Sequence, residues 1–472
     1  MTGITAGAAY APRLRIAAEE YEEAWGRFQG AGIRETAVPA ADEDALTMGY
    51  EAASRALDVG SVEPDDVTWL GFATTTPPVE EGESTSRLGE MLGIDAGASR
   101  RLFAGGTSAG TSAIWTAMDA ADRDECALVV VADAPRGEPD DAIDHAAGAG
   151  AAAFVLTADG PAQIVDRASW SVATPGTRFR RAGERSTEGL SVTQYDRDAF
   201  TEAVRGAVSG LDGDPEPDAV AIQAPDGKLP YRAAGALGVD TDAIAACATV
   251  HDLGDLGAAS VPVTLANALA DGHVSILAVG YGESAQAVAI ESDAAVPTAV
   301  DVDGEQPCTY AEYLRQRGDV TSGSPSGGGA YVSVPTWRRS IPQRYRLEAG
   351  RCPACEAISF PPEGACPDCR TLVEYEPVAL PGTGTIESVT TISQGGAPPE
   401  FAEQQSRSGD YAAVVVAFDA PDGGSSVSAP AMGTDADPSA FAVGDRIEAT
   451  IRRIYTQEGV TRYGFKVRPQ AE

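Results

Sequence analysis

Lysine is almost absent from this sequence. Only Lys228 and Lys466 occur in 472 residues, so nearly all of the 34 basic residues are arginine, while 70 residues are acidic and the formal net charge is -36. A protein that binds a polyanion needs a basic stripe to replace the counterions of the phosphates. The composition therefore disfavours nucleic acid and anionic membrane surfaces as partners.

The acidic residues are spread along the whole chain and do not form a terminal tail. High ionic strength shortens the Debye length to about 3 Å at 1 M salt and screens the self-repulsion of such a chain. The pattern favours adaptation to a salt-rich cytoplasm. The alternative is an acidic surface that binds a basic partner.

Long apolar runs and a signal sequence are also lacking. Apolar runs such as ALVVVA from Ala127 have the length of strands, well short of the roughly 20 residues of a membrane-spanning helix. The N-terminus has no charged region followed by an apolar core, so we expect a soluble cytoplasmic protein. Seven cysteines, four of them clustered, indicate a reducing compartment with a metal site and disfavour a disulfide framework.

The first three hundred residues alternate β-rich apolar runs with alanine-rich helical stretches, which predicts an α/β fold. DALTMGYEAASRAL from Asp44 and DAFTEAVRGAVSGL from Asp198 align without gaps, and an acidic turn and an apolar run follow each of them. We interpret this echo as two duplicated halves. Chance similarity between two alanine-rich helices is the alternative.

The rest of the chain changes character. SGSPSGGG from Ser322 is too polar for a core and is typical of a linker. Beyond it come TGTIESVTTIS, YAAVVVAFD and DRIEATIRRIY, three β-type segments that predict a small barrel resembling an OB-fold. We predict an α/β domain over 1–300, a helical segment and linker over 301–336, a zinc ribbon with its lead segment over 337–375, and the barrel over 376–472.

The cysteine cluster has the spacing of a metal site. CPACEAISFPPEGACPDC places two Cys-x2-Cys pairs ten residues apart, formed by Cys352, Cys355, Cys366 and Cys369. Four thiolates complete a tetrahedral shell around zinc and leave no position for a reactive water. The spacing therefore predicts a structural Zn²⁺; an iron centre or a redox pair is the alternative.

Several motifs together resemble a known family. They are GAAYAPRLRI from Gly7, VPAADEDALTM from Val38, GTSAGTSAI from Gly106, GAGAAAFVL from Gly148, QAPDGKLP from Gln223, GDLGAASVP from Gly254 and TYAEYLRQRG from Thr309. This region, most of 1–320, resembles archaeal hydroxymethylglutaryl-CoA synthase, a member of the thiolase superfamily, which implies a duplicated αβαβα fold. The C-terminal part resembles the rubredoxin-like zinc ribbon plus OB-fold module called DUF35, which in archaea bridges a thiolase and a hydroxymethylglutaryl-CoA synthase.

The resemblance also implies where the catalytic groups should be. Thr107 stands at the position of the family's nucleophilic cysteine, Thr75 at its general acid, Gln223 at its histidine and Asp255 at the asparagine of its GN motif. Claisen condensation on acyl-CoA needs a thiolate, proton-transfer groups and an oxyanion donor. Because the nucleophile, the acid and the imidazole are all replaced, we expect no catalytic residue at these positions.

Other residues are candidates to replace the missing catalytic groups. Ser108 and Ser112 lie beside Thr107 and are typical of helix caps, and Cys247 and His251 would share a face if their segment were one helix. We expect a buried cysteine and a surface histidine, and a solvated His145. The glycine-containing segment GAGAAAFVL from Gly148 lacks the Lys-Ser/Thr of a phosphate loop, so we expect its glycines to serve close packing.

These observations predict a noncatalytic scaffold that binds acyl-CoA or bridges a thiolase (acetyl-CoA acetyltransferase) complex. Lys228, in the PDGK loop, is a candidate contact for a CoA phosphate. Thiolase-fold proteins dimerise, so we expect a homodimer core within a heteromer. The alternatives are an active hydroxymethylglutaryl-CoA synthase or related acyltransferase, and an OB-fold nucleic-acid binder that uses the arginines of IRRIY and TRYGFKVR.

Overall fold

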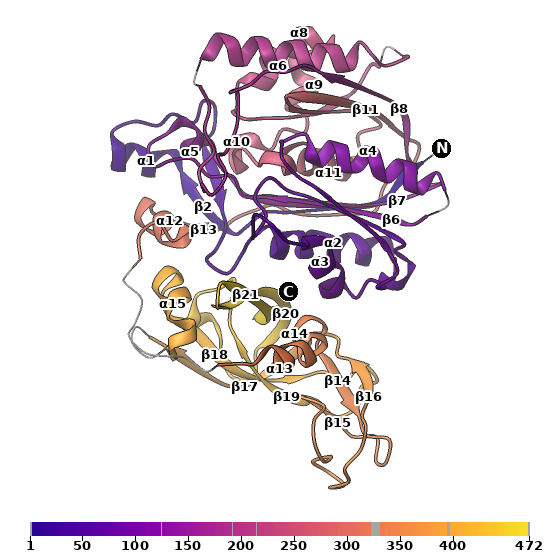
Figure 1. The fold of residues 1–472 in the computed structure, drawn as a ribbon, viewed down its shortest axis with the longest axis vertical. Helices are drawn as coiled ribbons and strands as arrows, with labels where there is room; N and C mark the ends of the chain where they lie inside the picture. The colour runs from indigo at the N-terminus through magenta and orange to yellow at the C-terminus, as the bar shows by residue number, and fades with distance from the viewer. Residues whose placement is uncertain are drawn as a thin grey trace. The chain divides into compact units, whose positions relative to one another are not determined.

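The chain forms two compact units in the computed structural model (Figure 1). The first consists of Met1–Pro39 and Asp44–Tyr313, and the second of Ala40–Glu43 and Leu314–Glu472. The structure describes residues 2–123, 125–190, 192–213, 215–321, 331–393 and 397–470. The glycine/serine stretch that predicts a linker lies outside the described residues, and the predicted domain boundaries stay predictions.

A mixed ten-stranded sheet forms the framework of the first unit. Its strand order is β5-β4-β6-β7-β1-β8-β11-β10-β9, and β12 pairs with β1. The strands are β1 (Gly3–Tyr10), β4 (Trp69–Ala73), β5 (Ser99–Phe103), β6 (Ala127–Asp133), β7 (Gly150–Thr157), β8 (Ala162–Ser171), β9 (Ala219–Ile222), β10 (Ser275–Gly282), β11 (Ser284–Ser292) and β12 (Thr298–Asp301). β6 is buried along its whole length, as expected for a continuous apolar run that is covered on both faces.

Helices divide this unit into five layers, α–β–α–β–α. The central helices α4 (Ala109–Ala121) and α11 (Ser260–Ala270) contact strands of both halves of the sheet, while α2 (Ala45–Gly60) covers β1, β6 and β7, and α6 (Thr193–Val208) covers β8, β10 and β11. Figure 1 shows α4 and α11 between the level of β6 and β7 and that of β8 and β11. The predicted α/β class is confirmed.

The two aligned sequence segments form equivalent helices in the two halves of this unit. α2 and α6 are the outer helices of the two halves, and the chain continues from them to β4 and β9, as the two aligned segments predict. Asp44 begins α2 with a capping box, because its carboxylate accepts from the Thr47 N–H while the Thr47 hydroxyl accepts from the Asp44 N–H. The second aligned segment runs past the end of its helix at Val208 as far as Leu211.

Short elements complete the first unit. A three-stranded sheet has the order β13-β2-β3. The elements are β2 (Leu14–Ala17), α1 (Ala18–Trp25), β3 (Glu35–Val38), α3 (Ser84–Leu92), α5 (Ala142–Ala146), α7 (Leu229–Arg232), α8 (Ala234–Leu237), α9 (Thr241–Ala245), α10 (Val250–Leu253) and β13 (Gln306–Pro307), and α12 (Tyr310–Arg317) follows at the boundary of the two units. In the described part of the chain, no helix has both the length and the apolar content needed to cross a bilayer.

The second unit contains a small ribbon and a barrel. The ribbon sheet has the order β15-β14-β16, and the five-stranded sheet the order β19-β18-β17-β20-β21. Its elements are α13 (Val334–Arg339), α14 (Ile341–Arg346), β14 (Glu348–Arg351), β15 (Ile358–Ser359), β16 (Glu376–Ala379), β17 (Thr383–Ile392), α15 (Ala402–Ser408), β18 (Tyr411–Phe418), β19 (Val427–Met432), β20 (Arg446–Gln457) and β21 (Val460–Pro469).

The five-stranded sheet is a nearly closed antiparallel barrel, which confirms the predicted fold class of this part. A bridge between Gly433, just after β19, and Val467 of β21 joins its two edge regions. In β18 every second residue is buried, so that Val414, Val416 and Phe418 face the interior. This period of two follows from the opposite directions of successive side chains in a strand.

Gly148 provides a test of packing in the first unit. A Cβ atom at this position would lie 1.8 Å from the carbonyl oxygen of Leu253, and the Gly148 N–H donates to the Asp255 carbonyl at 3.0 Å. The predicted packing role of this glycine is thus confirmed. We expect Gly148→Ala to destabilise the protein by about 1–3 kcal/mol, because backbone must move to admit the methyl group.

The measurement is the midpoint of urea unfolding followed by circular dichroism. Gly213→Ala is the matched control, since no atom lies within 4 Å of a Cβ there. Equal midpoints for the two variants would contradict the packing role.

Candidate functional site

The turn Gly257–Ala258, just before α11, is the point on which three of the four family-aligned positions converge. Gln223 donates from Nε2 to the Gly257 carbonyl at 2.8 Å, and Oδ1 of Asp255 accepts from the Gly257 N–H at 2.9 Å. Gly257 has φ +55°, and a Cβ there would lie 2.3 Å from Oδ2 of Asp133. Only glycine fits this turn.

Asp133 links the third position, Thr75, to the same turn. Its buried carboxylate, at the end of β6, accepts from the Thr75 hydroxyl at 2.6 Å, from the Thr75 N–H at 3.1 Å and from the Ala258 N–H at 2.8 Å. The hydroxyls of Thr74 and Thr76 also donate to it. The five donors occupy both oxygens of this carboxylate and fix the position of Thr75 relative to the turn.

Thr107, the fourth position, lies directly before α4. Its hydroxyl donates to the Tyr281 carbonyl at the end of β10. The first turn of α4 reaches the same place as the other three positions, because a Cβ at Gly110 would lie 2.2 Å from the Ala258 carbonyl oxygen. The fold therefore gathers all four aligned positions, although their side chains are two hydroxyls, an amide and a carboxylate.

Two arginines that sequence reasoning missed occupy this site. Arg178, in the segment between β8 and α6, donates from Nη1 to Oδ2 of the buried Asp255, and Arg180 donates from Nη2 to the Thr75 carbonyl. The available signal was the basic run TRFRR from Thr177, which is rare in so acidic a chain. The guanidinium groups neutralise the site and cover two of its polar atoms.

Two polar atoms of the site have no hydrogen-bond partner among the described residues. They are Oε1 of Gln223, whose side chain is 2% exposed, and Nη2 of Arg178. Leaving a buried donor or acceptor unpaired costs about 1–3 kcal/mol. An acceptor and a donor thus remain available at this site for a ligand.

The alternative candidates are not brought together into a catalytic pair. Cys247 lies between α9 and α10, where no helix continues, and burial raises the pKa of its thiol to about 12. His251 lies in α10, with Nε2 2.8 Å from the Tyr231 hydroxyl and Nδ1 2.6 Å from the Gly32 carbonyl oxygen. Ser108 caps α4 only by position, without a side-chain capping bond.

Two further single residues have different outcomes. The expectation of a solvated His145 is wrong: its side chain is fully buried, and Nδ1 accepts from the Gln29 N–H at 2.9 Å. The ring stacks on Phe28 at 5.6 Å between centroids, which the acidic neighbours in the sequence could not reveal. Lys228 is exposed at the start of α7, and no side-chain contact of it is found in the described ranges.

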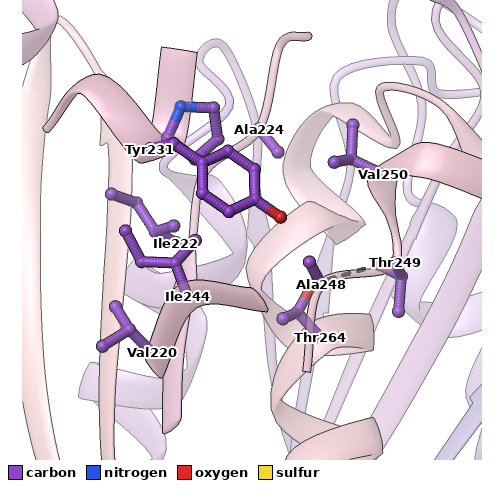
Figure 2. Close-up of a pocket in the computed structure, with 10 residues that line it drawn as sticks. Val220, Ile222, Ala224, Tyr231, Ile244, Ala248, Thr249, Val250 and Thr264 are labelled. Carbon is purple, nitrogen blue, oxygen red and sulfur yellow. Dashed lines mark hydrogen bonds between the residues drawn. The ribbon is translucent and has the colours of Figure 1, made fainter. Parts of the chain in front are cut away.

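A small cavity lies beside β9, the strand at one end of the large sheet (Figure 2). Its volume is about 10 Å³, which is room for one water molecule. Its walls are mainly apolar, and the Thr249 and Thr264 hydroxyls bond to each other at 3.1 Å. It is lined by Val220, Ile222, Ala224, Pro230, Tyr231, Ile244, Ala248, Thr249, Val250 and Thr264. None of the four family-aligned positions lines it.

The four cysteines of the second unit form a candidate metal centre. Their sulfur atoms all lie within 4.8 Å of one another, with Cys352 3.8 Å from Cys369 and Cys355 3.6 Å from Cys366. Cys352 and Cys366 are buried, and the other two are exposed. The set fits a tetrahedral thiolate site for zinc.

The two cysteine pairs have the same local structure. The N–H of Glu356 donates to the Cys352 carbonyl at 2.8 Å, and the N–H of Arg370 donates to the Cys366 carbonyl at 2.9 Å. Glu356 and Arg370 both have left-handed backbone, with φ of 64° and 62°. Equivalent turns therefore aim each pair of thiols at one point.

Comparison with known proteins finds relatives of the first unit and of the zinc ribbon. Residues 339–373 match the family described as ChsH2, rubredoxin-like zinc ribbon domain. The hydroxymethylglutaryl-CoA synthase of Methanobrevibacter smithii is 29% identical over 347 residues, covering 68% of this chain and 99% of that protein. That of Methanopyrus kandleri is 28% identical over 338 residues, covering 68% and 95%.

Solved structures show the fold of the first unit. The structure described as MvaS in complex with 3-hydroxy-3-methylglutaryl coenzyme A matches with a TM-score of 0.57 and 18% identity, covering 70% of this chain and 94% of that one. The HMG-CoA synthase complexed with CoA matches with a TM-score of 0.58 and 13% identity, with the same coverage.

Sequence and fold agree for each part of the chain. The chain combines a thiolase-fold unit with a rubredoxin-like zinc ribbon and a small antiparallel β-barrel. Homology to hydroxymethylglutaryl-CoA synthases covers 68% of the whole chain.

Proposed function

We propose that this chain is a noncatalytic relative of hydroxymethylglutaryl-CoA synthases that binds an acyl-CoA or serves as a scaffold for a thiolase in acyl-CoA and mevalonate metabolism. One observation carries the proposal. At the four aligned positions, Thr75, Thr107, Gln223 and Asp255, each side chain bonds to the protein itself, and none is a thiol, an acidic proton donor or an imidazole.

The chemistry of acyl transfer explains why these replacements matter. A threonine hydroxyl does not ionise as a cysteine thiol does at a helix N-terminus, and no base contacts Thr107 among the described residues. Asp133 is saturated by donors, and Arg178 neutralises Asp255. No group of the site is therefore prepared to take or give a proton.

Three features support acyl-CoA as the ligand. Relatives with the same fold bind CoA or hydroxymethylglutaryl-CoA, according to the descriptions of their structures. The unpaired Oε1 of Gln223 and Nη2 of Arg178 offer an acceptor and a donor to the reactive end of such a molecule. The exposed ammonium group of Lys228, in a chain poor in cations, is suited to a CoA phosphate.

Assembly is part of the proposal. β5 forms one end of the ten-stranded sheet, and Leu102 on it is 38% exposed. Such an edge strand with an exposed apolar residue is suited to pairing with a second copy, which supports a homodimer core. We propose that this core joins a thiolase in a larger complex.

The alternative is an active hydroxymethylglutaryl-CoA synthase, which the homology over 68% of the chain favours. A nucleic-acid role for the barrel has less support. Of the arginines that suggested it, Arg452, Arg462 and Arg468 are at most 9% exposed, and Arg453 is half-buried. They offer little charge to a phosphate backbone.

For the second unit we propose a structural Zn²⁺ held by Cys352, Cys355, Cys366 and Cys369. A closed shell of four thiolates stabilises the fold and leaves no open position for chemistry. The apolar residues of the ribbon, such as Leu347 and Ala349, belong to the same cluster as those of the barrel, so the metal would add stability that a core within the ribbon does not supply.

Acylation separates the noncatalytic proposal from its alternative. We expect the purified protein to acquire no acetyl group from acetyl-CoA, measured by intact mass spectrometry. Thr107→Cys places a thiol at the start of α4, and we expect acetyl-CoA to acetylate this variant faster than Ser112→Cys, within the same helix, because a bound CoA thioester would be delivered to position 107.

Each result of this experiment has a meaning. Acetylation of the unchanged protein would establish the active alternative. Equal labelling of the two cysteine variants would contradict acyl-CoA binding at this site and leave the scaffold role.

The scaffold role predicts a defined complex. We expect tagged protein, purified from its host at high salt, to contain a thiolase in a fixed ratio and at least two copies of this chain, measured by mass spectrometry and light scattering. Removing this chain should lower the condensation activity of that thiolase. A monomer without thiolase would contradict both the homodimer and the scaffold.

The zinc centre predicts about one zinc ion per chain. We expect Cys352→Ser to lose the metal and to increase hydrogen exchange from β14 to β16, because the turns lose their common ligand. Elemental analysis and exchange mass spectrometry measure the two effects. Cys126→Ser is the control, since Cys126 is half-buried in the first unit. Full zinc content in Cys352→Ser would exclude this ligand set.

A further inference from the structure

The second unit includes four residues from the N-terminal part of the chain. Ala40–Glu43, between β3 and α2, belongs to the same compact unit as Leu314–Glu472. Asp42 is 6% exposed and Glu43 is 5% exposed. Acidic residues are almost never buried to this degree unless they are paired. Both carboxylates therefore require partners within the second unit.

Asp42 is surrounded by donors from two strands of the barrel and the turn after β19. Lys466 of β21, whose side chain is fully buried, donates to Oδ2 of Asp42 at 2.7 Å, and the Thr434 hydroxyl donates to the same atom at 2.9 Å. The Arg453 N–H of β20 donates to the Asp42 carbonyl at 2.9 Å. Side chain and backbone of Asp42 are both recognised.

The neighbouring residues of the segment are held as well. The Ala41 N–H donates to Oε1 of Gln316 at 2.8 Å. Oε1 of Glu43 lies 3.7 Å from Nη2 of Arg452, which is fully buried. The segment is therefore bound along its length, in the manner of a peptide ligand.

The basic residues that contact Asp42 and Glu43 belong to a larger buried network of ion pairs. Arg452 donates to Asp435 at 2.7 Å, and Arg468 lies 3.1 Å from Asp435 and 2.6 Å from Glu448. The barrel itself thus supplies anions for Arg452 and Arg468. Among the described residues, the Lys466 ammonium group forms an ion pair with one carboxylate, that of Asp42.

The buried ammonium group of Lys466 requires the carboxylate that the segment Ala40–Glu43 provides. Burial lowers the pKa of Lys466, and the Asp42 carboxylate opposes this shift. Burial also raises the pKa of Asp42, but the charges of Lys466 and Arg452 outweigh it, so that the pKa is lowered. Removing one partner of a buried ion pair leaves the other uncompensated, which is far costlier than losing a surface pair.

We propose that the barrel contains a binding site for a short acidic peptide segment, and that Asp42–Glu43 is the ligand that this chain provides for itself. Lys466 and the Arg453 N–H bind Asp42, and Arg452 contacts Glu43. A barrel that starts at Leu314 is incomplete, because its buried lysine lacks the carboxylate to which it donates. Asp44, the third acid of the run, caps α2 instead.

A double-mutant cycle in the full chain tests the pair at the centre of this site. We expect Asp42→Asn to accelerate hydrogen exchange in β20 and β21 about tenfold or more, although residue 42 is distant in sequence, because Lys466 stays buried without an anion. Asp42→Asn/Lys466→Met should restore slow exchange. Asp58→Asn, at an exposed acid of α2, should change nothing in these strands.

Unchanged exchange in Asp42→Asn, or a double variant no better than the single one, would overturn the proposal. A second experiment tests binding directly. In a full chain whose residues 40–43 are replaced by glycine and serine, the peptide Val-Pro-Ala-Ala-Asp-Glu-Asp-Ala, added in trans, should slow exchange in β20 and β21 again. The same peptide with amides in place of its carboxylates should not. Equal effects of the two peptides, or none, would overturn recognition of acidic residues.

Discussion

The packing of α4 and α11 between the two halves of the ten-stranded sheet is the constraint on which the rest of the first unit depends. Most residues of both helices are buried, so the helices consist largely of small and apolar residues; Asp119 lies on an exposed face of α4. Their close approach requires glycine at specific points, such as Gly110 against the Ala258 carbonyl. The same approach brings the start of α4, where Thr107 lies, close to the turn before α11, which contains Asp255. Thr75 and Gln223 reach this turn from the ends of β4 and β9.

The four aligned side chains of the site all belong to a network of hydrogen bonds within the protein. Asp133 accepts from Thr75 and Ala258, and Gln223 and Asp255 bond to Gly257. These bonds stabilise the fold, because each pairs a buried polar group. The same residue positions therefore contribute to the stability of the fold, and the unpaired atoms of Gln223 and Arg178 are the exceptions in this network.

The second unit solves a different problem, the stability of a small core. Its ribbon gathers four thiols around one point, and its barrel buries ion pairs among its strands. Many of its basic residues are thus used inside the protein, which explains how arginines in an acidic chain need not indicate a surface for nucleic acid. In the first unit the buried carboxyl group of Asp133 is paired differently, because its donors are hydroxyl and backbone N–H groups.

The sequence by itself determined whatever depends on local pattern. Apolar periodicity gave the α/β class and the β-rich second unit, the repeated helix-strand pattern located α2 and α6, and the spacing of Cys352 to Cys369 defined the thiol cluster. Resemblance to a family located Thr75, Thr107, Gln223 and Asp255, which the fold does bring together. Tertiary structure alone decided which partners these side chains have, because Arg178, Arg180 and Asp133 reach them from segments distant in the sequence. The burial of His145 and the assignment of Asp42 to the second unit had the same origin: burial and charge pairing depend on which segments meet in space, and no local pattern records that.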